Sequence, residues 1–129
     1  MLAKIDAASL QGIEALNVEV EVHVGYSDTC VVIVGLPDAA VRESRDRVGS
    51  ALENSGFKFP KGRTTINLAP ADLKKEGPSF DLPIAMGMLA ASEQMETSLL
   101  PHYMIVGELA LTGAVRPVKG ILPIALRAQ

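Results

Sequence analysis

The chain of 129 residues is 48% hydrophobic and 21% charged, with a formal net charge of −3. This length and composition predict one globular domain over residues 1–129 and exclude disordered, collagen-like and coiled-coil chains. The near balance of charges argues against an electrostatic grip on nucleic acid by the whole domain. No apolar run reaches the length of a membrane span, and the start of the chain lacks the pattern of a secretory signal. The single cysteine, Cys30, cannot form an internal disulfide, which suits a reducing cytoplasm.

Two strands are predicted in the first third of the chain. Residues 18–24 alternate between valine and polar residues, which is typical of a strand with one buried face. Residues 30–34 are apolar on both faces, as expected of an inner strand. Gly, Ser and Asp at 25–28 favour a turn, so we expect the two strands to form a hairpin.

These strands also carry candidate metal-ligating and nucleophilic side chains. Glu19, Glu21 and His23 share one strand face, which we interpret as a solvated sheet face because neighbouring side chains there are widely spaced for one small metal ion. Cys30 begins an apolar strand, where a thiol is expected to behave as a small hydrophobe, and no partner base is visible.

The rest of the chain predicts helices alternating with strands. Asp38 is the expected N-cap of a helix over residues 38–55, on which Glu43 and Arg47 should pair four residues apart. The further expected elements are a strand at 63–68, a polar loop at 74–78, a helix apolar all round at 81–92, a strand at 103–111, a return strand at 114–118 and a helix from 119 onward. This order predicts an α+β fold, a two-layer α/β sandwich with a mixed sheet. The last helix has no stop signal before Gln129, so we expect the natural chain to continue.

The middle of the chain is locally basic. Its basic residues are Arg42, Arg45, Arg47, Lys58, Lys61 and Arg63. The interpretations are a solvated helix face or a contact surface for phosphate groups, those of DNA among them, or for an acidic partner. Phe57 and Phe59 are interleaved with these bases, but phenylalanines are expected to pack in the core. We therefore expect weak, salt-sensitive binding of DNA by this domain alone.

Ser79 is the strongest nucleophile candidate. It follows a Gly-Pro pair at the entrance to the apolar helix, where backbone N–H groups could stabilise an oxyanion. The simpler interpretation is that Ser79 or Asp81 caps that helix. The chain has no G-x-x-x-x-G-K-S/T, G-x-G-x-x-G or G-x-S-x-G string.

Five long strings resemble a known family. They are residues 34–48 (VGLPDAAVRESRDRV), 54–60 (NSGFKFP), 67–73 (NLAPADL), 75–85 (KEGPSFDLPIA) and 106–118 (VGELALTGAVRPV). On these strings the chain resembles the N-terminal domain of the ComM/YifB family of magnesium-chelatase-like AAA+ ATPases. The resemblance covers nearly the whole chain.

The resemblance implies a Lon proteolytic domain-like fold, a P-loop ATPase module beyond Gln129 that uses ATP and Mg²⁺, and assembly into a ring, expected to be a hexamer. It implies that the parent protein is a cytoplasmic motor acting in DNA branch migration during transformation. No cofactor is expected in these 129 residues, because the ATPase motifs lie outside them.

The Lon resemblance also assigns positions for a catalytic dyad. Residues 76–79 resemble the Lon nucleophile string, which places Ser79 at the nucleophile. The string at 107–117 places the activating lysine at Leu122, and a leucine cannot deprotonate a serine. Lys119 lies three residues earlier and is the one nearby substitute. The resemblance thus implies a non-proteolytic accessory domain. The alternatives are a Ser79-dependent Lon-like peptidase and a chelatase component.

Overall fold

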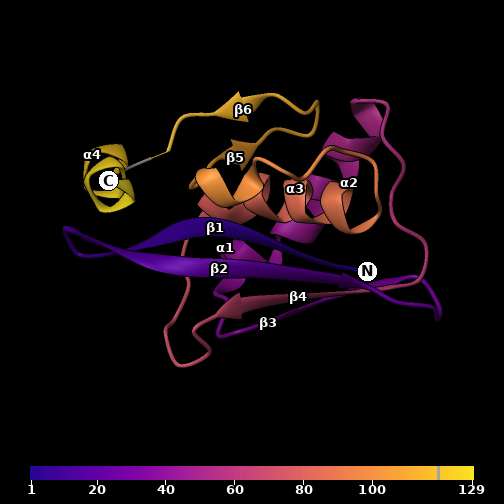
Figure 1. Cartoon of the computed structure of the whole chain (residues 1–129), viewed down its shortest axis with the longest axis horizontal. Coiled ribbons are helices and arrows are strands. Elements are labelled where there is room, and N and C mark those ends of the chain that lie inside the picture. Colours follow the sequence, from indigo (N-terminus) through magenta and orange to yellow (C-terminus); the bar gives the residue numbers. More distant parts are fainter. Residues whose placement is uncertain (119) are drawn as a thin grey trace.

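The computed structural model describes residues 1–118 and 120–129 and contains a four-stranded mixed sheet (Figure 1). Its strands are β1 (Leu2–Gln11), β2 (Glu14–Val24), β3 (Cys30–Val34) and β4 (Arg63–Ala69). They lie in the order β1-β2-β4-β3, with β3 parallel to β4 and the other pairs antiparallel. The predicted α+β fold with a mixed sheet is confirmed.

The helices and a small hairpin cover one face of this sheet (Figure 1). The helical elements are α1 (Ala39–Arg42), α2 (Ser44–Asn54), η1 (Pro78–Phe80), α3 (Asp81–Ala91), η2 (Leu100–His102) and α4 (Ile121–Ala128). Strands β5 (Glu108–Leu109) and β6 (Val115–Arg116) pair with each other beyond α2 and α3. Within the described part of the chain, no helix is both long and apolar enough to cross a membrane.

The core lies between α3 and the sheet. Val18, Val20 and Val22 of β2 and Ile66 and Leu68 of β4 point to this side and are buried. The predicted alternation of β2 is confirmed, and so is the helix that is apolar all round. α3 needs no wet face because the sheet, α2 and β5 all contact it.

The predicted hairpin between residues 18–24 and 30–34 is wrong. The chain does reverse at 25–29, but β4 lies between β2 and β3. The turn residues determine that the chain reverses direction. Which strands hydrogen-bond to each other depends instead on residues distant in sequence, here those of β4. β3 is consequently an edge strand and not an inner one, with Cys30 and Val34 exposed. The interpretation of Cys30 as a small hydrophobe within an inner strand is corrected with it, because its side chain is exposed.

Other boundaries also differ from the prediction. The helix expected at 38–55 is divided at Glu43 into α1 and α2. The strand expected at 103–111 contracts to an isolated bridge at Met104 and the two residues of β5, so the hairpin with β6 is short.

Candidate functional site

Asp81 is the first residue of α3, and its carboxylate contacts residues of α2 and β5, which are distant from it in sequence. The carboxylate is fully buried. It accepts hydrogen bonds from Ser44 Oγ at 2.5 Å, from Arg47 Nε at 2.7 Å and Nη2 at 3.0 Å, and from the backbone N–H of Leu109 at 3.0 Å. We call these four residues the Asp81 cluster. It joins α2, α3 and β5 through charge-assisted bonds.

Arg47 is the cation of this cluster. Ser44 and Arg47 are three residues apart on α2 and so project from the same side of the helix. The Arg47 guanidinium also donates to the Ala40 carbonyl at 2.7 Å and pairs with Glu43 at 3.4 Å, as the spacing predicts. Its hydrogen bonds to Asp81 raise the pKa of Arg47 above its ordinary value, despite an opposing effect of burial. The Arg47 side chain is only 19% exposed, so its charge interacts mainly with the buried Asp81 carboxylate and little with solvent.

The Asp38 carboxylate joins two loops beside the cluster. Its Oδ1 accepts from the backbone N–H of Val41 at 2.8 Å, which confirms Asp38 as the N-cap of α1. Its Oδ2 accepts from the N–H of Gly77 at 3.1 Å. The Asp38 N–H donates to the carbonyl of Lys75 at 2.9 Å, and the Lys75 N–H donates to that of Leu36 at 3.0 Å. The loop before α1 and the loop before η1 therefore hold each other in place.

Lys75 is a buried cation that the sequence did not reveal. The segment 74–78 reads as a polar surface loop, but the Lys75 side chain is fully buried. Its Nζ donates to the carbonyl of Pro70. Burial lowers the pKa of the Lys75 ammonium, and the nearby Asp72 opposes this only in part.

Ser79 lies in η1, directly before α3, and is half-buried. Its carbonyl accepts from the N–H of Gly107 at 2.9 Å, which ties η1 to the segment before β5. The interpretation that Ser79 or Asp81 caps the apolar helix is wrong, because within the described residues neither η1 nor α3 has a side-chain cap. Asp81 points instead into its cluster.

Leu122 lies on α4, which is at the end of the molecule away from α2 (Figure 1). Its side chain is 67% exposed and lines a surface hollow together with Ile13 and Ala15. Ser79 is not among the residues that line this hollow. Lys119, the other candidate base, lies outside the described residues.

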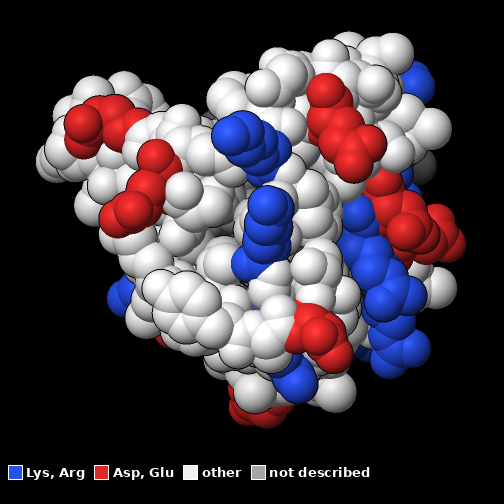
Figure 2. Space-filling model, turned by 90° about the vertical axis from the view of Figure 1, so that its right-hand side faces the viewer, with Lys and Arg blue, Asp and Glu red and all other residues white. Residues whose placement is uncertain are grey.

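The basic segment is spread over two regions. Arg42 and Arg45 line a hollow of about 260 Å³ beside the β3 edge, while Lys58, Lys61 and Arg63 are exposed in and after the loop that leads to β4. Figure 2 shows that Lys and Arg side chains on one face form short strips with acidic side chains beside them. Phe59 packs against the core as expected, but Phe57 is 41% exposed, which corrects the expectation that both are buried.

The open face of the sheet carries Glu19, Glu21 and His23, as the alternation predicts. Glu21 accepts from the Asn67 amide at 2.8 Å, and Glu19 lies 3.7 Å from Lys4 Nζ. No group of three His, Cys, Asp or Glu side chains within residues 1–118 and 120–129 is arranged to hold a metal ion.

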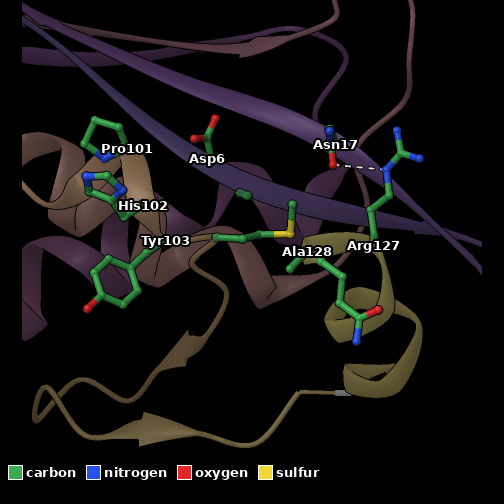
Figure 3. A pocket seen from close by; sticks show the side chains of 10 residues that line it. Asp6, Asn17, Pro101, His102, Tyr103, Arg127 and Ala128 are labelled. Atoms are coloured by element: carbon green, nitrogen blue, oxygen red, sulfur yellow. Dashed lines mark hydrogen bonds between the residues drawn. The ribbon is translucent and has the colours of Figure 1, made fainter.

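Another hollow, of about 340 Å³, lies between β1, η2 and the end of α4 (Figure 3). Asp6, His102 and Tyr103 line one side and Arg127 the other. Arg127 Nε donates to Asn17 Oδ1 at 3.2 Å. No sequence pattern indicates this grouping, because its residues come from both ends of the chain and even the bonded pair Asn17 and Arg127 is 110 positions apart.

These features define a small α+β domain in which buried ionic contacts lock the motif segments together. Residues 18–129 match the family described as Subunit ChlI of Mg-chelatase, and the chain belongs to that family. It is 50% identical over 99% of its length to Competence protein ComM of Haemophilus influenzae and 49% identical over 98% to the uncharacterized protein YifB of Escherichia coli. An uncharacterized protein of Mycobacterium tuberculosis is 39% identical over 99%. The resemblance to the ComM/YifB proteins is confirmed, and the chain spans about a quarter of the length of each of these relatives.

Proposed function

We propose that this chain is the non-proteolytic accessory domain of a cytoplasmic magnesium-chelatase-like AAA+ ATPase that moves DNA branch points. The observation that carries the proposal is the 50% identity to Competence protein ComM over 99% of the chain. Because the chain spans a quarter of that relative, the remaining three quarters have room for the ATPase module, which would bind ATP and Mg²⁺ and assemble into a hexameric ring. The fold proposed for this domain is of the Lon proteolytic type.

The contacts around α3 support an architectural role. Among the described residues the buried carboxylate near Ser79 is that of Asp81, which is bonded to Arg47, Ser44 and a backbone N–H and is therefore already occupied as an acceptor. A serine needs a base within hydrogen-bond reach to become a nucleophile. Leu122, at the position that the Lon resemblance assigns to the activating lysine, is an exposed apolar residue that lines a hollow without Ser79.

The test of the motor uses the full-length protein and a synthetic four-way DNA junction. We expect ATP-dependent movement of the junction, and loss of this movement in a protein that lacks residues 1–129. The motor proposal fails if the complete reading frame lacks a G-x-x-x-x-G-K-S/T string or if the full-length protein with ATP leaves the junction unchanged.

The accessory role is tested separately with a fluorophosphonate probe for activated serines. We expect no labelling of the wild-type protein at Ser79, and the same background in Ser79→Ala. Labelling that disappears in Ser79→Ala would establish the peptidase alternative instead. DNA contact by the exposed bases is expected to be weak and to fall steeply with salt.

A further inference from the structure

Helix α4 carries more apolar side chains than it buries against the rest of the domain. Residues 121–126 are all apolar, and the first charged side chain of the helix is Arg127. A helix without a polar face is typical of a buried position between other elements. α4 lies instead at one end of the molecule, beside the β1–β2 turn and apart from the other helices (Figure 1).

Within residues 1–118 and 120–129, packing contacts cover one side of α4. Ile124 is buried against Ala8 of β1 and Ala15 of β2. The bond between Arg127 and Asn17 holds the end of the helix in this orientation (Figure 3). At about 100° per residue, Leu122 and Leu126 are each turned about 200° from Ile124 and therefore lie on the opposite side. Their exposed fractions are 67% and 59%.

The β1–β2 turn extends this apolar area. Ile13 is 93% exposed and lines, with Leu122 and Leu126, a surface hollow of about 360 Å³. We call these three residues the α4 apolar face. Large apolar side chains grouped in this way mark an interaction surface more often than a free one.

We propose that the α4 apolar face is the docking site for the segment of the same chain that follows Gln129. This inference rests on the proposed function, in which residues 1–129 form the first quarter of a longer protein. Relatives are about four times as long as this chain, and α4 is its last element, so a continuing chain leaves directly from the face to be covered. Such a tethered segment has a high effective concentration, which favours it over a second molecule.

The experiment places a photo-crosslinker in the full-length protein. Leu122 is replaced by p-benzoylphenylalanine, and the same replacement at Leu111, an exposed leucine between β5 and β6, is the matched control. Assemblies are formed from mixed ¹⁴N- and ¹⁵N-labelled chains, so that mass spectrometry separates crosslinks within one chain from those between chains. We expect the Leu122 site to crosslink within one chain to peptides beyond residue 129, and the Leu111 site not to do so. Crosslinks between chains, or none at the Leu122 site, would overturn the proposal.

A second measurement avoids the bulky side chain. In the full-length protein, Leu122→Gln combined with Leu126→Gln should raise amide hydrogen exchange in α4 and in the docked segment about 10-fold, whereas Leu111→Gln should not. Unchanged exchange in the double variant counts against docking. Junction movement by the wild-type protein is measured independently, so the motor proposal and the docking proposal can fail separately.

Discussion

Removal of the Asp81 carboxylate should be among the most destabilising single changes in this domain. Asp81→Ala deletes the acceptor of four hydrogen bonds and leaves Arg47 beside a void with a charge that is only 19% exposed. Breaking one partner of a buried ion pair costs about 3–5 kcal/mol. Since small domains are stable by only about 5–15 kcal/mol, the variant should lose a large part of its folding free energy.

The assay is urea unfolding followed by circular dichroism, arranged as a double-mutant cycle. Asp81→Ala, Arg47→Met and the double variant are compared with wild type. Removal of both charges should cost less than the sum of the single changes, because the double variant leaves no unpaired charge behind. We expect a coupling free energy of about 1–3 kcal/mol.

Two results would refute this reasoning. If Asp81→Ala loses less than about 1 kcal/mol, the cluster does not hold α2, α3 and β5 together. If the single costs simply add, Arg47 and Asp81 do not act as a pair. Glu43→Ala is the control, because its carboxylate is exposed and its 3.4 Å contact with Arg47 should contribute under about 1 kcal/mol.

The remaining predictions concern the loops beside the cluster. The pKa of Lys75 is lowered in the folded protein, so just below pH 10.5 the unfolded chain binds more protons than the folded one. The free energy of unfolding of the wild type, measured by urea titration, should therefore rise relative to that of Lys75→Met as the pH approaches 10.5. A difference between the two proteins that does not change with pH would contradict this. Gly35→Ala should lower the free energy of unfolding by several kcal/mol, because φ is +106° and the new Cβ would lie 2.2 Å from the backbone oxygen of Leu68. Gly56→Ala is the control, because φ is +84° but no atom lies within 4 Å of the new Cβ, so the loss should be only about 1–2 kcal/mol. Similar thermal midpoints for the two variants would count against the close approach at Gly35. Asp38→Ala should lose about 1–2 kcal/mol in the same unfolding assay and Ser79→Ala under about 0.5, because only the former caps a helix; the reverse order would restore the capping interpretation of Ser79.

Local signals in the sequence predicted local structure well. The Asp38 cap, the alternation of β2 and the apolar α3 all depend on residues within one or two turns of one another, and all three are confirmed. β1 was not anticipated, because four of its ten residues are not apolar and three are alanines, which favour strands weakly. β1 is stabilised as a strand by its pairing with β2 over ten residue pairs, because its own strand propensity is weak.

The parts that depend on distant residues could not be predicted. Whether Asp81 caps its own helix or accepts from Arg47, 34 positions earlier, is decided by how α2 packs on α3. The position of β4 between β2 and β3 likewise depends on which strands pair best, and the turn residues at 25–28 do not determine this. Lys75 is charged and follows another lysine, so its burial, with Nζ bonded to the carbonyl of Pro70 directly after β4, has no signature in the sequence.

The positions of the motif strings separate architecture from activity. The string at 34–48 supplies Asp38, Ser44 and Arg47, that at 75–85 supplies Gly77 and Asp81, and that at 106–118 supplies Leu109. These residues bond to one another, so a chain with these strings needs them in order to hold its helices against the sheet. Their presence therefore accounts for a shared fold without any shared reaction at Ser79. Any activity that distinguishes this chain from other proteins with these strings is then expected on surfaces outside this cluster, such as the α4 apolar face with its exposed Ile13, Leu122 and Leu126.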